Sequence, residues 1–211
     1  RHGLDLALSY IYMNKANALT ELAIYDQALE YHFKGAEIKE KLNDTKGLMQ
    51  SYHNIGNLYS QISKIEEALL YYRKALNVAI QLRLVTSLGN LYSNMAVTLA
   101  RLDRNDSVPY YYDKSIGSFE ATGDKAGLAM AFNNFGNYLL EQRLLNESED
   151  YLMRALELRR QLVNVNHLAN TLINLGNLMI EKKNNKIAEV YFNEALEIVK
   201  EQNGLVKGDV L

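Results

Sequence analysis

The sequence contains no cysteine and only one proline, Pro109, among its 211 residues. Without cysteine the chain cannot form a disulfide framework, a thiol nucleophile, an iron–sulfur cluster or a cysteine-ligated zinc site. A single proline argues against a proline-rich linker and against a turn-dense β-sandwich. Basic charge is not in excess either, because 23 Lys and Arg residues face 25 Asp and Glu residues. Since nucleic-acid binders draw most of their affinity from basic side chains on phosphates, we expect no nucleic-acid partner.

Long apolar runs are also missing from the sequence. A membrane-spanning helix needs about 18 or more consecutive apolar residues, so we expect no direct membrane insertion of this segment. No signal-peptide pattern is evident at the start, and a cytoplasmic location is favoured although the compartment is not fixed. The chain begins with Arg1 rather than Met, and we expect it to be part of a longer protein.

The main positive feature is an internal repeat with a period of 40 residues and no insertion or deletion over five copies. Such a period is typical of helical repeat proteins. Four series of residues recur at this spacing: Tyr31, Tyr71, Tyr111, Tyr151 and Tyr191; Asn14, Asn54, Asn94, Asn134 and Asn174; Ala16, Gly56, Ala96, Gly136 and Gly176; and Ala28, Ala68, Val108, Ser148 and Ala188.

Apolar spacing within each copy predicts two helices separated by a short break. In the second copy the first stripe is Tyr52-x2-Ile55-Gly56-x2-Tyr59, and the second is Ala68-x3-Tyr72-x2-Ala75. One such pair cannot bury its apolar face, but stacked pairs form a continuous core. We therefore predict an all-α chain that forms a single α-solenoid over residues 1–211. The expected repeats are 9–48, 49–88, 89–128, 129–168 and 169–208, and residues 209–211 begin a possible further helix.

These motifs resemble the tetratricopeptide repeat, with Tyr where that family often has Trp. The fifth copy carries the same pattern, Leu172-x2-Leu175-Gly176-x2-Met179 and then Ala188-x3-Phe192-x2-Ala195. The 40-residue form is similar to repeats of kinesin light chains, spindle-orientation adaptors and bacterial sensor kinases. The resemblance covers about residues 9–208 and implies antiparallel helix pairs in a right-handed superhelix. It also implies a protein or peptide ligand in a concave groove.

Catalytic and cofactor-binding motifs are absent from the sequence. There is no phosphate-binding glycine loop, no dinucleotide fingerprint, no H-E-x-x-H and no G-x-S-x-G. The four histidines, His2, His32, His53 and His167, are far apart and form no metal-ligand pattern. We expect no enzyme activity, no metal site and no cofactor.

The candidate site is a row of amides on the first helix of each copy, which we call the Asn ladder. Asn pairs three residues apart share one helical face, and nine of the ten equivalent positions are Asn. The candidate peptide-binding residues are Asn14, Asn17, Gln50, His53, Asn54, Asn57, Asn90, Asn94, Met130, Asn133, Asn134, Asn137, Asn170, Asn174 and Asn177. Carboxamides can both donate to and accept from a peptide backbone. Alternatively, the amides hydrogen-bond between neighbouring repeats and fix how the repeats stack.

Other polar features of the sequence describe the expected surroundings of this site. The lining beside the ladder is nearly uncharged, so we expect a neutral or mildly basic ligand segment rather than a clamp for a terminal carboxylate. Charge runs at 34–41, 154–160 and 182–186 are expected to be solvated, and the tyrosines to pack between adjacent copies. The predicted function is a protein-interaction module, the sensory or regulatory part of a larger signalling protein. The alternative is a structural scaffold that self-associates through its terminal repeats.

Overall fold

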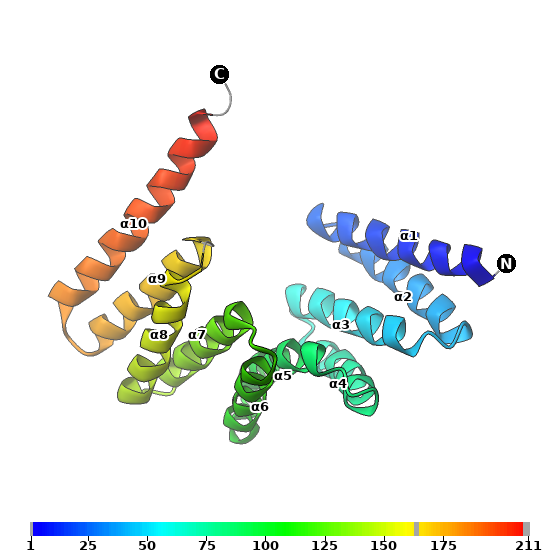
Figure 1. Cartoon of the computed structure of the whole chain (residues 1–211), viewed down its shortest axis with the longest axis horizontal. Coiled ribbons are helices and arrows are strands. Elements are labelled where there is room, and N and C mark those ends of the chain that lie inside the picture. Colours follow the sequence, from blue (N-terminus) through cyan, green and yellow to red (C-terminus); the bar gives the residue numbers. More distant parts are fainter. Residues whose placement is uncertain (1, 163–164, 209–211) are drawn as a thin grey trace. The chain divides into compact units, whose positions relative to one another are not determined.

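The computed structural model describes residues 2–162 and 165–208, and within these residues it is helical throughout, with no strand (Figure 1). The helices are α1 (His2–Glu21), α2 (Tyr25–Lys41), α3 (Thr45–Gln61), α4 (Ile65–Gln81), α5 (Val85–Arg101), α6 (Val108–Thr122), α7 (Lys125–Glu141), α8 (Leu145–Arg160), α9 (Val165–Glu181) and α10 (Asn185–Gly208), with a 3-10 turn at Asn105–Ser107 before α6. None of these described helices is both long and apolar enough to cross a membrane. Residues 209–211, where a further helix was expected, lie outside the described residues.

Odd-numbered helices are the first helices of the pairs and even-numbered helices are the second. The chain divides into two compact units, unit 1 (Arg1–Ser118) and unit 2 (Phe119–Leu211). In unit 1, α1 packs on α2 and α3 on α4, while α2 contacts α3 and α4 contacts α5. In unit 2, α7 packs on α8 and α9 on α10, and α8 contacts α9. Each unit is therefore built from stacked helix pairs, and the predicted all-α solenoid class is confirmed.

The 40-residue period follows from the lengths of the helices and turns. The second pair consists of two helices of 17 residues, α3 and α4, and the turns around them contain three residues each, such as 62–64. The extra length of this repeat, compared with the common unit of about 34 residues, therefore lies in the helices. The first helices begin at 45, 85, 125 and 165, four residues before the repeat starts expected from the sequence.

Each turn contains one residue in the left-handed region of backbone space. In the described part of the chain these residues are Ala23, Asn43, Ser63, Arg83, Asp103, Gly123, Arg143 and Lys183. At Ser63 the ending of α3 follows a Schellman pattern: the Ser63 N–H donates to the Ser60 carbonyl at 3.2 Å, and the Lys64 N–H donates to the Tyr59 carbonyl at 2.9 Å. The same local geometry recurs in the described turns, so successive helices within each unit are joined in the same way.

Small residues in the repeat allow the two helices of a pair to pack closely. A Cβ at Gly56 would lie 2.7 Å from the Tyr72 ring, and one at Gly136 would lie 2.7 Å from Leu152 Cγ. On the second helices, Ala28, Ala68 and Val108 are fully buried. The two small-residue series of the sequence therefore lie where the helices of a pair meet.

The tyrosine series packs mainly inside the helix pairs. The Tyr71 ring lies 5.6 Å from Tyr59 and 6.0 Å from Tyr52, both on the preceding first helix. One of its neighbours belongs to the copy before, Phe33, at 5.8 Å. Packing between adjacent copies, which the sequence suggested, therefore explains only part of these aromatic contacts.

Candidate functional site

The structure places every residue of the Asn ladder on a first helix, and none of them is fully buried. The half-buried members are His53, Asn54, Asn94, Met130, Asn133, Asn134, Asn137 and Asn174. The exposed members are Asn14, Asn17, Gln50, Asn57, Asn90, Asn170 and Asn177. The ladder is therefore separate from the apolar core, as its helical spacing predicted.

In unit 1, part of the ladder forms hydrogen bonds between repeats. The Asn94 amide nitrogen lies 2.9 Å from His53 Nε2 and donates to Asn57 Oδ1 at 3.2 Å. Asn57 Oδ1 also accepts from the Tyr72 hydroxyl at 2.9 Å. Because an amide nitrogen only donates, His53 Nε2 is the acceptor and its proton sits on Nδ1. These side chains join α3, α4 and α5, so they serve the stacking that the second interpretation expected.

Burial shifts the pKa values of the two ring systems in this network. Burial lowers the pKa of His53, which keeps the ring neutral and able to accept. Burial also raises the pKa of Tyr72 to about 12, so its hydroxyl stays protonated and able to donate. The donor and acceptor roles in the network are therefore stable at neutral pH.

In unit 2, one amide of the ladder again links two repeats. Asn174 Nδ2 on α9 donates to Asn133 Oδ1 on α7 at 3.0 Å. Other amides bond within one helix: Asn137 Nδ2 donates to Glu141 Oε1 at 2.9 Å. Asn133 Nδ2 also lies 3.5 Å from Asn134 Oδ1, which is at the limit of a hydrogen bond.

The remaining amides are available to a ligand. Among the described residues, the structure gives no side-chain hydrogen bond to Asn14, Asn17, Asn90, Asn170 and Asn177, all of which are exposed. Gln50 Nε2 makes one long hydrogen bond, to Asn54 Oδ1 at 3.4 Å, across one turn of α3. The Asn ladder is thus divided between amides that tie repeats together and amides whose donors and acceptors face solvent.

A hollow in unit 1 brings both kinds of amide together. It has a volume of about 220 Å³ and lies between α1 and α3. Asn17, Asn54 and Asn57 line it, and His32 of α2 also contributes to its wall. His32 is buried, and burial together with the nearby Lys39 lowers its pKa to about 4. Glu21 of α1 also lines the hollow, so it presents the amides together with one carboxyl group.

Two cations near the first helices were missed by the sequence analysis. Lys39 and Arg159 belong to runs expected to be solvated, yet their exposed fractions are only 1% and 5%. They occupy the same repeat position, and the copies between them place Ala79 and Phe119 there, both buried. The expectation for these two residues is wrong because the last turn of the second helix faces the next pair. Comparing the five copies at this repeat position, which we call the column of Lys39 and Arg159, would have revealed two charges among apolar residues.

The neighbours of Lys39 show where this column lies. The Lys39 ammonium lies 3.1 Å from Ser51 Oγ on α3 and 3.9 Å from Met13 Sδ on α1. It also lies 5.5 Å from the centre of the Tyr10 ring. A side chain from a second helix therefore reaches the face of two first helices beside the ladder. Burial lowers the pKa of Lys39.

Arg101, in the last turn of α5, already has hydrogen-bond partners. Arg101 donates from Nη1 to the Ser60 carbonyl at 3.1 Å and to Ser60 Oγ at 3.0 Å, on the preceding first helix. It therefore links two repeats. Among the described residues, no cluster of three or more His, Asp or Glu side chains is arranged to hold a metal ion.

Comparison with known proteins identifies the fold and the family. The profile of the tetratricopeptide repeat matches residues 7–81 and 127–201, which is most of the chain. No curated protein matches the chain in sequence.

Three solved structures illustrate the similarity. A Rap protein complexed with competence and sporulation factor is 13% identical with a TM-score of 0.82, covering 92% of this chain and 54% of that one. The apo quorum sensor NprR from B. thuringiensis is 14% identical with a TM-score of 0.74, covering 90% and 53%. YrrB, described as a tetratricopeptide repeat protein with an unusual peptide-binding site, is 21% identical with a TM-score of 0.56, covering 95% and 91%. At such identities these likenesses establish the fold alone. With its 40-residue helix pairs and the matched profile, the chain belongs to the tetratricopeptide repeat family.

Proposed function

We propose that this chain binds an extended peptide segment along the first helices of its repeats. The observation that carries the proposal is the hollow of unit 1, where Asn17, Asn54 and Asn57 present amides beside one another. An extended backbone is a row of alternating donors and acceptors, and carboxamides can satisfy both. Amide side chains supply no acid, base or nucleophile, so the role that these three residues support is binding.

The free amides of the ladder support this role on energetic grounds. Asn in a helix interior is less favourable than Ala by roughly 0.6 kcal/mol. Where Asn94 or Asn174 bonds across repeats, stacking offsets that cost. At Asn14, Asn17, and Asn170 the described structure offers no such compensation, and a ligand would supply it.

The relatives also support a peptide ligand and a signalling context. YrrB is described as having a peptide-binding site, NprR as a quorum sensor, and the Rap protein was solved with competence and sporulation factor. By analogy we assign this chain to the sensory or regulatory part of a larger signalling protein.

Selection of randomised peptides on the intact chain tests the proposal. Asn17→Ala combined with Asn54→Ala should weaken binding of an enriched peptide by about tenfold or more, because two hydrogen bonds of roughly 0.5–1.5 kcal/mol each are lost. The matched control is Asn77→Ala on α4, which is exposed and lies away from the ladder. Asn57 stays unchanged, since its removal would leave the buried Tyr72 hydroxyl without its acceptor.

Two outcomes would contradict the proposal. If no peptide is enriched, the chain does not act as a peptide-binding module. If enriched peptides bind the double variant and the intact chain equally well, the hollow of unit 1 is not the site.

A second candidate function is self-association through the terminal repeats, and one observation favours it. Leu196 and Val199 of α10 are 49% and 42% exposed. Their equivalents in the four earlier second helices are buried, among them Leu76, Ala79, Leu156 and Arg159. In this chain α10 therefore presents to solvent the face that a following pair covers elsewhere.

A further inference from the structure

Arg159 is a buried cation without a partner in unit 2. Its Nε is buried and makes no hydrogen bond, and among the described residues no ion pair with it is formed. Burial lowers the pKa of its guanidinium, yet an arginine remains charged in a protein. The inner nitrogen of the guanidinium therefore lacks a partner within the fold, and no carboxylate of the described residues neutralises the group.

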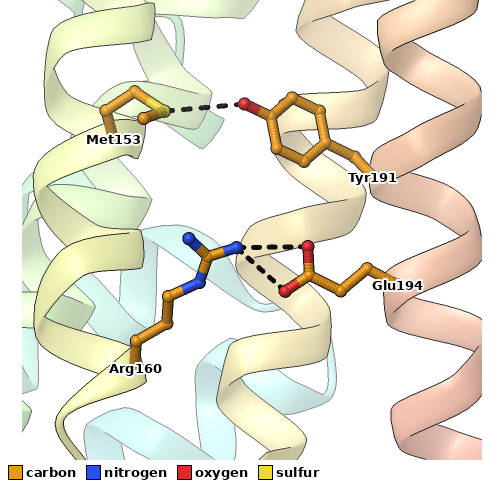
Figure 2. Close-up of polar contacts among 4 residues, drawn as sticks. All are labelled: Met153, Arg160, Tyr191 and Glu194. Carbon is orange, nitrogen blue, oxygen red and sulfur yellow. Dashed lines mark hydrogen bonds and ion pairs between the residues drawn. The ribbon is translucent and has the colours of Figure 1, made fainter.

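The next residue provides a direct contrast. Arg160 is exposed on α8, and its Nη2 lies 2.9 and 3.1 Å from the two carboxylate oxygens of Glu194 on α10 (Figure 2). Glu194 thus neutralises Arg160, and in the same view the Tyr191 hydroxyl donates to Met153 Sδ at 3.7 Å (Figure 2). Of these two neighbouring arginines in the described structure, Arg160 has a carboxylate partner and Arg159 has none.

The repeat indicates which surface Arg159 approaches. Lys39, three copies earlier, reaches Met13 on its own first helix and Ser51 on the next. The equivalent positions around Arg159 are Asn133 on α7 and Thr171 on α9. Asn133 bonds to Asn174 across these helices. By the equivalence with Lys39, we infer that the guanidinium end of Arg159 approaches the ladder face of unit 2.

A partly dehydrated charge that lacks an ion-pair partner destabilises a fold, because the hydration lost at its buried atoms is not replaced. The position tolerates apolar side chains, since Ala79 and Phe119 occupy it in other copies. Arg159 is therefore not required for packing, and its cost is understandable if a ligand supplies the missing partner. Such a trade of stability for binding is common at functional sites.

We propose that Arg159 is the binding site for a carboxylate of the peptide ligand, held at the ladder face between α7 and α9. This inference rests on the proposed peptide-binding function and adds the chemistry of one ligand group. A guanidinium binds a carboxylate through two parallel hydrogen bonds. One carboxylate neutralises one arginine, whereas a phosphate would bring about two negative charges to a site with a single cation. The nearly uncharged lining was predicted from residues of the first helices alone. Arg159 lies on a second helix and was therefore not included.

The test uses the intact chain, Arg159→Met and the matched control Arg160→Met. Methionine keeps the length and flexibility of the arginine stem without its charge. Two randomised peptide libraries are selected on each protein. One library is fused at its C-terminus, so only Asp and Glu side chains offer a carboxylate, and the other ends in a free carboxylate.

We expect an acidic residue to be enriched at one position of the first library, or the free carboxylate to be required in the second. Replacing that carboxylate by its amide should raise the Kd for the intact chain about tenfold or more, as expected for a lost charged hydrogen bond. With Arg159→Met the same replacement should change the Kd by less than about twofold, because the coupled partner is already gone. With Arg160→Met the large effect should remain.

Melting temperatures of the variants provide a second readout. Arg159→Met should melt at the same temperature as the intact chain or higher, because an unpaired buried charge is removed. A clear drop would show that Arg159 supports the fold and would overturn the inference. Enriched peptides without a carboxylate preference would overturn it while leaving the proposed function intact. Failure to enrich any peptide would reject both.

Discussion

At the scale of single residues, His32 is a core residue of the first copy that no later copy repeats. His32 occupies the position that holds Tyr72, Tyr112, Leu152 and Phe192 in the later copies. It is buried, and burial first and the charge of Lys39 second lower its pKa to about 4. The folded state therefore favours the neutral ring far more strongly than the unfolded chain does.

This position makes stability depend on pH. A histidine with a lowered pKa contributes its full share above the unfolded value of about 6.5 and loses it as the pH falls toward 4. The pKa of His53 is also lowered, which acts in the same direction. We expect His32 to lower the free energy of unfolding by about 3 kcal/mol between pH 6.5 and pH 4.

Chemical denaturation at several pH values measures this effect. His32→Phe places the aromatic ring of the fifth copy in the same position and should flatten the pH dependence over this range. A control variant, His167→Gln, changes a histidine that is exposed on α9. Equal slopes for the intact chain and His32→Phe would show that His32 does not control acid stability.

At the scale of elements, the turns have an unusual sequence. Of the eight left-handed turn residues in the described part of the chain, only Gly123 is a glycine. For a residue with a Cβ, this conformation raises the free energy of the folded state by roughly 1–2 kcal/mol. The fold accepts that cost repeatedly, because a short turn of this conformation reverses the chain both within pairs, as at Ser63, and between pairs, as at Asn43.

Paired substitutions should therefore have opposite effects. Ser63→Gly should raise the free energy of unfolding by about 0.5–1 kcal/mol, and Gly123→Ala should lower it by about 1 kcal/mol. A Cβ at Gly123 meets nothing within 4 Å, so a loss there reports conformation and not a clash. Thermal and denaturant unfolding of both variants check this. Changes of the same sign would argue that the turns are not limited by backbone conformation.

The elements were predictable from the sequence, whereas the local bonding of the ladder was not. The helix pairs could be predicted from the apolar spacing and from the small residues Gly56 and Ala68, because helix formation depends on residues close together in the sequence. Asn54 and Asn57 share a face, but only Asn57 meets the Tyr72 hydroxyl. Which amide is bonded depends on the residue opposite it on another helix, and no periodicity within one helix contains that information. The column of Lys39 and Arg159 was readable in principle, by comparing copies.

At the scale of the whole chain, consecutive pairs within each unit pack in one way: a second helix packs on the first helix that follows it. The described chain contains no such first helix after α10. A second helix presents its last turns to the next first helix, as α2 does to α3 and α8 to α9. Leu196 and Val199 of α10 are in these turns and remain exposed. On α1, Ile11 is 60% exposed, while its equivalents Ser51, Leu91, Ala131 and Thr171 are buried.

The two uncovered faces are complementary, because they repeat an interface that the interior already forms. Stacking α10 of one copy on α1 of another would bury both, in a head-to-tail contact. We expect sedimentation velocity to show an average mass that rises with protein concentration. Leu196→Glu should abolish the rise by placing a charge in the contact. Val190→Glu is the matched control, since position 190 and its equivalents, including Leu70 and Tyr110, are exposed in every copy. A monomer mass at all concentrations, or equal effects of both variants, would exclude self-association through these faces and leave peptide binding as the remaining proposal.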